Sequence, residues 1–284
     1  MPIELFRPDV ADLPGVLRAL ASWQRDRSPM QLHPGDLGWQ WRFGAENVAE
    51  LVRVWRGDDG IQAVGFLDGP DLLRLAIAPD QQASHALIAR IVDDFPRILP
   101  EGDASLEARC GELLAGTLSA AGWTPDEPWT PLERDLASPV PESGLRIEVT
   151  DESRAEVRAA VHRASFTGSV FSAERWHTLA SGPAYSDARC LVGFDDEGEA
   201  VAAATVWSAG AGRPGLLEPV GVHSDHRGRG HGTAITLAAA AALRDLGSSS
   251  AVVCTPSANV GAVATYVAAG FERFEDVRDF RRPA

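Results

Sequence analysis

Three glycines at alternate positions, beside two arginines, are the most distinctive chemical feature of the sequence. Gly228, Gly230 and Gly232 follow an apolar run typical of a strand and precede a long helix-forming segment. Such glycines leave backbone N–H groups uncovered at the start of a helix, where the helix dipole favours negative charge. Arg227 and Arg229 add fixed positive charge. The pattern predicts a loop that binds phosphate groups.

Two common nucleotide-binding loops do not fit this segment. A dinucleotide-binding fingerprint that begins at Gly228 requires glycine at position 233, where the chain has Thr233. A P-loop requires lysine, and the sequence contains none. The glycines alone are also compatible with an ordinary connection from a strand to a helix, so other parts of the chain must decide.

The composition limits the classes of function. At 284 residues, 45% hydrophobic and 23% charged, the chain has the balance of a globular protein of two ordinary domains. A net charge of −14 argues against nucleic acid as a partner and mildly favours cationic ligands. We find no apolar stretch long enough to span a membrane and no secretory signal at the N-terminus, so we expect a cytoplasmic protein.

Cysteine and lysine usage narrows the chemistry further. The three cysteines form no Cys-x-x-Cys pair, so we expect buried free thiols, without a disulfide framework and without a metal site. The absence of lysine excludes Schiff-base chemistry on the protein. Acid–base catalysis must therefore use His, Glu, Asp, Tyr or Cys.

Hydrophobic periodicity and turn residues divide the chain into two similar halves. Residues 137–144 contain small residues and two prolines, which is typical of a linker, and we expect domains at 1–136 and 145–284. In the first half we expect strands at 3–6, 51–55, 62–67, 72–78, 105–108 and 132–136, and helices at 12–25, 37–43, 83–99 and 112–121. In the second half we expect strands at 145–149, 190–194, 201–207, 216–222, 251–255 and 277–281, and helices at 155–164, 173–179, 233–246 and 259–269.

The two halves match element for element, which predicts a duplicated domain. Gly122-Trp123 and Gly270-Phe271 close equivalent helices. Only the second half carries the glycine and arginine loop, because the first has Gln82-Ala83-Ser84-His85-Ala86-Leu87 at the equivalent place. We therefore expect one phosphate-binding site in the chain.

The segment Arg227-Gly228-Arg229-Gly230-His231-Gly232 has the pattern Arg-x-x-Gly-x-Gly and resembles the acyl-CoA pyrophosphate loop of the GNAT acetyltransferase superfamily. The later pattern Asn259-x-x-Ala262-x-x-x-Tyr266-x-x-x-Gly270-Phe271 and the order of elements also resemble that superfamily. The resemblance implies an α/β fold with a mixed sheet in each half, in tandem GNAT form. Tandem chains with one decayed copy look like mycothiol synthase and related acetyltransferases.

The first half departs from this pattern. It has Leu118 where the second has Tyr266, and Gly111 where the second has Asn259. By the resemblance it is a degenerate copy that supports structure or substrate binding. Both halves also end early after these helices, so we expect closing strands that are shortened or shared between the halves.

The resemblance implies acetyl-CoA as co-substrate, with its pantetheine arm between the strands 216–222 and 251–255. The Val222 amide would then face the thioester oxygen, and Tyr266 would protonate the departing thiolate. The implied cofactor-binding residues are Val220, Gly221, Val222, Arg227, Gly228, Arg229, Gly230, His231, Gly232, Thr233 and Asn259.

The base that deprotonates the acceptor amine is left open between three candidates. Glu218 lies on the same strand face as Leu216 and Val220, although related enzymes often have the base at the position of Leu216. His223 and water are the alternatives. We look for the acceptor walls among the aromatic residues Phe166, Phe171, Trp176 and Trp207.

The resemblance implies an N-acetyltransferase (EC 2.3.1 class) that acts on a small-molecule amine by direct attack in a ternary complex. A mycothiol-synthase-like enzyme, a protein acetyltransferase and a non-catalytic acyl-CoA sensor or scaffold are the alternatives. We expect no nucleic-acid or membrane partner. Whether the chain is a monomer or a homodimer is left open.

Overall fold

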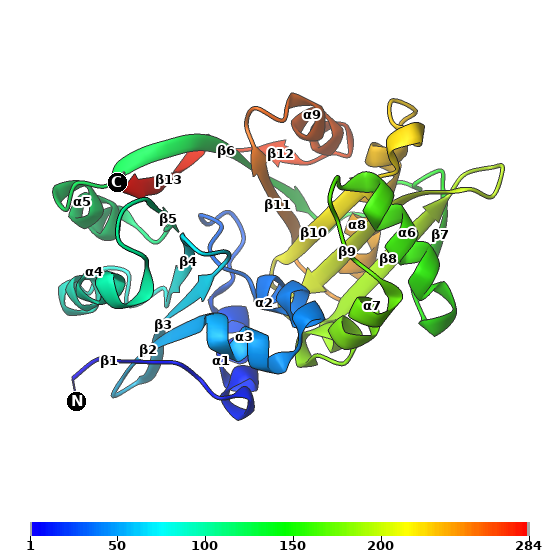
Figure 1. Ribbon diagram of the computed structural model, residues 1–284. Coiled ribbons are helices and arrows are strands. Elements are labelled where there is room, and N and C mark those ends of the chain that lie inside the picture. Colours follow the sequence, from blue (N-terminus) through cyan, green and yellow to red (C-terminus); the bar gives the residue numbers. More distant parts are fainter. Residues whose placement is uncertain (1, 283–284) are drawn as a thin grey trace.

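The computed structural model describes residues 2–282, which form one continuous mixed sheet with helices on its faces (Figure 1). The order of strands in this sheet is β1-β2-β3-β4-β5-β13-β6-β11-β10-β9-β8-β7, and β12 pairs with β6 beside this path. The strands are β1 Glu4–Phe6, β2 Val52–Gly57, β3 Gly60–Leu67, β4 Leu72–Ile77, β5 Ala104–Glu107, β6 Thr124–Asp135, β7 Arg146–Val149, β8 Ala188–Phe194, β9 Ala200–Ser208, β10 Gly215–Val222, β11 Ser250–Pro256, β12 Glu272–Arg273 and β13 Val277–Arg282.

The helices follow the predicted order, with one addition. They are α1 Leu13–Trp23, α2 Pro34–Gln40, α3 Ala45–Leu51, α4 His85–Ile98, α5 Glu112–Ala120, α6 Ala155–Ser165, α7 Ala173–Ala180, α8 His231–Asp245 and α9 Val260–Ala268. The short helix α3 was not predicted, because its last turn runs without a break into the apolar strand β2. The predicted α/β fold with a mixed sheet is confirmed.

Each half exchanges its last strand with the other. β6 belongs to the first half in sequence but pairs antiparallel with β11 over seven residue pairs, from Ser250↔Asp135 to Pro256↔Trp129. In return the C-terminal strand β13 pairs with β5 and with β6. The expectation that closing strands are shared between the halves is therefore confirmed, and the two halves cannot separate without breaking the sheet.

The predicted strand at 132–136 is too short. β6 begins at Thr124 and contains Pro125, Pro128 and Pro131. Proline cannot donate a hydrogen bond to a neighbouring strand, so a segment with three prolines does not have the sequence pattern of an interior strand. The pairing of β6 with β13 is accordingly irregular between Arg278 and Phe280.

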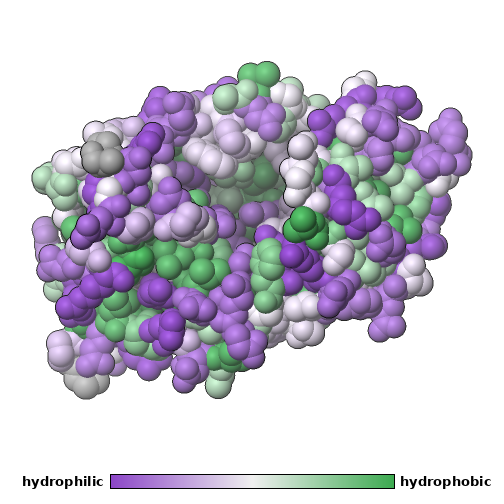
Figure 2. Space-filling view, viewed as in Figure 1, coloured by the Kyte–Doolittle hydropathy of each residue, from purple (hydrophilic) through white to green (hydrophobic). Residues whose placement is uncertain are grey.

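The helices of the second half cover both faces of its sheet. Along β9, Ala202, Ala204 and Val206 pack in one core with Ile235 and other residues of α8. The opposite face of β9 is directed toward α6 and α7. On this face Trp207 packs with Ala155 of α6 and Trp176 of α7. The space-filling view shows the surface hollowed near the middle of the molecule, with apolar residues at the bottom of the hollow (Figure 2). Within residues 2–282, no helix combines the length and apolar character needed to cross a membrane.

Candidate active site

The strands β10 and β11 run parallel but remain paired over only two positions, Gly215↔Ala251 and Leu216↔Val252. Beyond Leu216, β10 stays with β9 while β11 stays with β6, so the two strands diverge toward their carboxyl ends (Figure 1). The backbone edge of β10 facing β11 is therefore unpaired from Leu217 onward. This is the opening that the resemblance implied.

The pairing of β10 with β9 fixes the direction of the Val222 amide. His223 N–H donates a 2.9 Å hydrogen bond to the carbonyl oxygen of Val201, so Val222 and Ala202 form a non-hydrogen-bonded antiparallel pair. In such a pair the N–H and C=O groups point away from the neighbouring strand. The Val222 carbonyl indeed accepts a 3.4 Å hydrogen bond from Arg227 Nε, outside β9. The Val222 N–H thus faces the opening beside β11.

A bulge in β10 between Leu217 and Val220 releases Glu218 and Pro219 from the pairing with β9. The backbone carbonyl of Glu218 accepts a 2.8 Å hydrogen bond from Trp207 Nε1 instead. Because a bulge reorients the side chains that it contains, the alternation of faces along an unbroken strand does not hold at Glu218. The direction of the Glu218 side chain is therefore set by the bulge and not by the alternation along β10.

The glycine loop connects β10 to α8 through a short turn at Ser224–His226. Gly228 and Gly230 have φ angles of +76° and +87°, which residues with a Cβ rarely adopt. A Cβ atom built at either position would meet no atom within 4 Å, so the backbone there is open to a ligand. Gly230 directly precedes the first residue of α8, where N–H groups are free to bind an anion. These free N–H groups are the kind of feature with which helix starts bind phosphate groups.

The side chains of the predicted loop residues are not all directed outward. The Arg227 guanidinium donates a 2.7 Å hydrogen bond to the carbonyl of Ser165 at the end of α6, and so braces the loop against that helix. Arg229 is exposed. Gly221 and Gly232 are close-packing positions, because an added Cβ would lie 2.6 Å from Ser165 Cβ and 3.0 Å from Thr265 Cγ2, respectively.

The remaining predicted cofactor-binding residues lie around the same opening. His231 and Thr233 are half-buried in the first turn of α8. The side chain of Asn259 accepts a 3.2 Å hydrogen bond from the Ala262 amide and caps α9. Its position at this helix start is explained by capping; the predicted contact with the cofactor stays a prediction.

A cavity of about 310 Å³ lies at the opening between the halves, and Glu218, Val220 and Tyr266 all line it. The structure thus brings the two predicted catalytic residues to one cavity. Its other lining residues are Met30, Asp68, Leu72, Arg74, Glu107, Arg109, Trp129, Phe166, Leu216, Leu217, Pro219, Val253, Cys254, Thr255 and Asp279.

Residues 159–271 match the family model described as "Acetyltransferase (GNAT) family". Residues 159–271, which lie in the second half of the chain, are therefore similar to this acetyltransferase family. A search of curated proteins finds no match.

Solved structures extend the likeness in fold to the whole chain. A GCN5-related N-acetyltransferase from Sphaerobacter thermophilus is 19% identical, with a TM-score of 0.57, over 99% of this chain and 95% of its own. A tandem GNAT protein from the clavulanic acid biosynthesis pathway is 16% identical, with a TM-score of 0.62, over 99% and 98%. A GNAT-family acetyltransferase from Colwellia psychrerythraea is 14% identical, with a TM-score of 0.61, over 99% of both chains. At these identities the likeness shows the tandem GNAT fold.

The first half supplies most of the charged residues that line the cavity. Arg74 on β4 forms ion pairs with Asp36 at 2.9 Å, with Glu107 at 3.1 Å and with Asp68 at 3.5 Å. Arg109 pairs with Asp279 of β13 at 3.1 Å. Among the lining residues, four carboxyl groups (Asp68, Glu107, Glu218 and Asp279) stand against two guanidinium groups. The cavity is therefore acidic.

Glu218 has an unusual environment for a carboxyl group. Burial raises its pKa from 4.5 to about 8, and the negative charge of Asp36 adds to this effect, while Arg74 opposes it. Burial also raises the pKa of Asp36. Such a pair shares one proton near neutral pH, so its titration belongs to the pair. Glu218 is consequently a much stronger base than an exposed glutamate.

Tyr266 is buried against Phe271, with ring centroids 5.8 Å apart. Burial, together with the charge of Glu218, raises its pKa to about 12. The hydroxyl therefore keeps its proton at physiological pH. In the same cavity, burial raises the pKa of the Cys254 thiol to about 11, so that this thiol is also protonated and a weak nucleophile.

The other sequence-based candidates lie elsewhere. His223 starts the turn at Ser224–His226, where its Nδ1 accepts a 3.2 Å hydrogen bond from the Asp225 amide, and it does not line the acidic cavity. Phe166 lines that cavity and Phe171 lines a neighbouring hollow. Trp176 and Trp207, which were expected as acceptor walls, are core residues exposed by 4% and 1%, and neither lines the acidic cavity.

Sequence reasoning missed the charged residues of the first half. The available signal was Arg74, a charged residue inside the apolar run Leu72-Leu73-Arg74-Leu75. A buried arginine in a strand requires acidic partners, but the sequence does not say which acids these are. The role of Asp36 was missed for another reason. Its Oδ2 also accepts a 2.6 Å hydrogen bond from the His33 amide, so its position in the sequence is that of an ordinary helix-capping residue.

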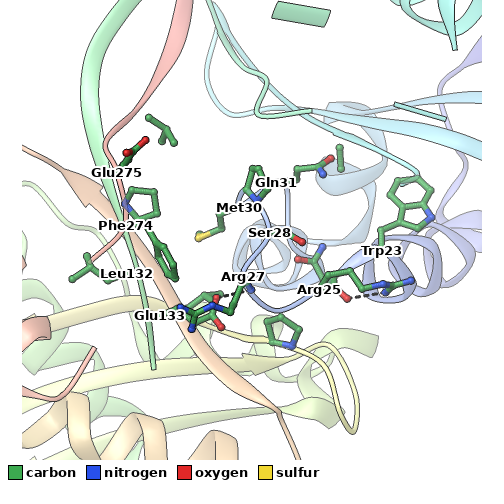
Figure 3. A pocket seen from close by; sticks show the side chains of 17 residues that line it. Trp23, Arg25, Arg27, Ser28, Met30, Gln31, Leu132, Glu133, Phe274 and Glu275 are labelled. Carbon is green, nitrogen blue, oxygen red and sulfur yellow. Dashed lines mark hydrogen bonds between the residues drawn. The ribbon is translucent and has the colours of Figure 1, made fainter. Parts of the chain in front are cut away.

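A larger cavity of about 380 Å³ adjoins the acidic one and shares Met30 with it. Figure 3 looks into this cavity, with Met30 and Gln31 from the segment after α1 on one side and Leu132 and Phe274 on the other. Neither Glu218 nor Tyr266 lines it. We therefore place the candidate reaction centre in the smaller, acidic cavity.

Proposed function

We propose that this protein is an acetyl-CoA-dependent N-acetyltransferase that acts on a small cationic amine. The observation that carries the proposal is the acidic cavity at the β10–β11 opening, which holds both Glu218 and Tyr266 and adjoins the strand that leads into the glycine loop. The GNAT family match of residues 159–271 supports it.

The residues that would hold acetyl-CoA are the loop amides from Gly228 to Gly232 and the free edge of β10 at Val220 and Val222. The open backbone at Gly228 and Gly230 supports this assignment. When bound, acetyl-CoA supplies an activated acyl group as a thioester. Arg229 is exposed beside the loop and offers positive charge to phosphates.

The acidic cavity suits an acceptor that arrives as an ammonium ion. Four lining carboxyl groups against two guanidinium groups attract a cation and disfavour an anion. Once Glu218, with its pKa near 8, has lost its own proton, the carboxylate accepts a proton from the ammonium group. A carboxylate of ordinary pKa would be a weaker base for this step, because proton transfer from an amine of pKa near 10 would be more strongly uphill.

Val222 and Tyr266 act on the charge that develops during acyl transfer. The Val222 N–H faces the opening and donates a hydrogen bond to the oxygen that becomes negative, an effect that contributes on the order of 3 kcal/mol in comparable oxyanion sites. The Tyr266 hydroxyl, protonated at neutral pH, donates its proton to the departing thiolate. Glu218 thus acts on the amine, the Val222 N–H on the carbonyl oxygen and Tyr266 on the sulfur.

The proposal requires direct attack by the amine, without an acyl-enzyme intermediate. Cys254 is the one thiol that lines the acidic cavity, and its raised pKa of about 11 makes it a poor nucleophile. Initial velocities measured with both substrates varied should therefore give intersecting reciprocal plots, and Cys254→Ala should retain turnover. Parallel reciprocal plots for the unaltered chain, together with loss of turnover in Cys254→Ala, would instead establish a covalent mechanism and overturn direct attack.

We further propose that the first half is a degenerate copy that builds the acceptor side of the cavity. Met30, Asp68, Arg74, Glu107 and Arg109 come from it. It contributes no glycine loop, and α4 begins with a Ser84 side chain that accepts a 3.3 Å hydrogen bond from the Leu87 amide. That capping contact occupies the helix end that binds phosphate in the second half.

A further inference from the structure

Two histidines and an aspartate meet beside the glycine loop, outside the acidic cavity. Asp195 lies in the turn between β8 and β9, His226 in the turn at Ser224–His226, and His231 is the first residue of α8. One potential ligand atom from each of the three lies within 4.8 Å of those of the other two. All three side chains are partly accessible, so that an ion can reach them from solvent.

The intramolecular contacts of the three residues do not explain why they converge. His226 Nδ1 is buried and has no hydrogen-bond partner, and it lies 3.9 Å from Asp195 Oδ2, which is too long for a hydrogen bond. A buried polar atom without a partner is costly. An ion between these two atoms would give both of them a partner.

The ligand side chains are held by their backbones and by second contacts. Asp195 Oδ1 accepts a 2.8 Å hydrogen bond from the Glu199 amide, which leaves Oδ2 free and fixes the carboxylate. His231 is held by α8, and the amide of His226 donates a 2.9 Å hydrogen bond to the His223 carbonyl. His223 itself is not counted as a ligand, because its Nδ1 already accepts the Asp225 amide hydrogen.

The donor set selects the type of metal. Two imidazole nitrogens and one carboxylate oxygen favour zinc and other late divalent transition metals over Mg²⁺ and Ca²⁺, which prefer oxygen ligands. Ligand atoms around a tetrahedral zinc ion are separated by roughly 3.4 Å, given metal–ligand distances near 2 Å. A spacing of up to 4.8 Å therefore requires only side-chain adjustment.

We propose that Asp195, His226 and His231 form a binding site for a zinc-like divalent transition metal ion, with the remaining coordination position left to water. His226 precedes and His231 follows the segment 227–230 of the glycine loop. The ion therefore connects the β8–β9 turn to both ends of this segment. The site was not predicted, because ligands at positions 195, 226 and 231 have no recognised metal-binding spacing in sequence.

Calorimetric titration of the chelator-treated full chain with ZnCl₂ at pH 7.5, without acetyl-CoA, tests this proposal. We expect saturable binding of one zinc ion per chain and no binding of Mg²⁺ at the same concentrations. His226→Ala and Asp195→Asn should each weaken zinc binding by at least about tenfold, since even outer contacts to a metal contribute that much. Asparagine keeps the Oδ1 that accepts the Glu199 amide, so the turn is preserved.

The matched control is His85→Ala, which removes an exposed histidine in the first half, remote in sequence from the cluster. Its zinc affinity should equal that of the unaltered chain. Thermal melts without metal establish that each variant is folded. Absence of saturable zinc binding, or equal affinity in His226→Ala and the unaltered chain, would overturn the proposal.

Discussion

Trp207 Nε1 donates a 2.8 Å hydrogen bond to the backbone carbonyl of Glu218, and helix α2 of the first half packs directly on the same indole ring. Cβ atoms added at Gly35 and Gly38 would each come within 2.5 Å of Trp207. Asp36, between these glycines, carries the negative charge that adds to the rise in the pKa of Glu218. One helix of the first half therefore acts on the charge of the carboxyl group and packs on the tryptophan that supports its backbone.

Gly38→Ala is expected to lower both stability and turnover. The new methyl group would overlap Trp207 Cζ3 at 2.5 Å, so the ring or α2 must shift, at a cost of about 1–3 kcal/mol. A shift of Trp207 would also move Glu218. Thermal melting and kcat check this expectation against Gly116→Ala in α5, where an added Cβ meets nothing within 4 Å and alanine favours the helix. Equal behaviour of the two variants would contradict the positioning role of α2.

Glu218→Gln is expected to change the pH dependence of kcat/KM for the amine. In the unaltered protein this parameter should rise with pH through an apparent pKa near 8, because the Asp36–Glu218 pair must ionise before Glu218 can accept a proton. The variant should lose about 10²-fold in rate near pH 7 and recover as pH approaches the pKa of the amine. Acetyl-CoA affinity should not change. A uniform loss at every pH would mean that Glu218 only binds the ammonium ion, and no loss would exclude it as the base.

The same substitution should change the pH dependence of stability. A carboxyl group whose folded pKa is raised from 4.5 to about 8 stabilises the fold below pH 4.5, and this contribution is lost as pH rises through 8. Glutamine does not ionise. The melting temperature of Glu218→Gln relative to the unaltered protein should therefore increase between pH 5 and pH 9, by a few degrees. Glu142→Gln, at an exposed linker position, is the control. A difference that is independent of pH would refute the shifted ionisation.

Tyr266→Phe is expected to lower kcat by about 10²-fold with nearly unchanged acetyl-CoA affinity, because phenylalanine keeps the packing on Phe271 and removes only the proton donor. Tyr185→Phe is the matched control, since Tyr185 is the other of the two tyrosines in the sequence and packs near Trp207 outside the acidic cavity. Steady-state kinetics on both variants separate the roles. Unchanged kcat in Tyr266→Phe would show that this tyrosine is structural.

Local sequence patterns predicted the elements of each half better than they predicted contacts between the halves. The glycine loop and Tyr266 belong to patterns within a few tens of residues, and local geometry fixes them. The role of Asp36 depends on β10, nearly two hundred residues later in the chain. The exchange of β6 and β13 is likewise set by which strand edges meet in the folded sheet, and no periodicity within β6 reports its partner.

Release of coenzyme A thiol from acetyl-CoA, measured with a thiol-reactive dye over a panel of cationic and neutral amines, tests the central claim most directly. We predict amine-dependent, saturable release, faster with cationic amines, and an acetylated amine detectable by mass spectrometry. Gly230→Leu should abolish both binding and release, because a side chain there would block the approach of phosphate to the backbone N–H groups. Gly60→Leu, at a turn glycine with φ of +101° in the first half, should retain both activities. Tight acetyl-CoA binding without thiol release for any amine would contradict the account and identify an acyl-CoA sensor.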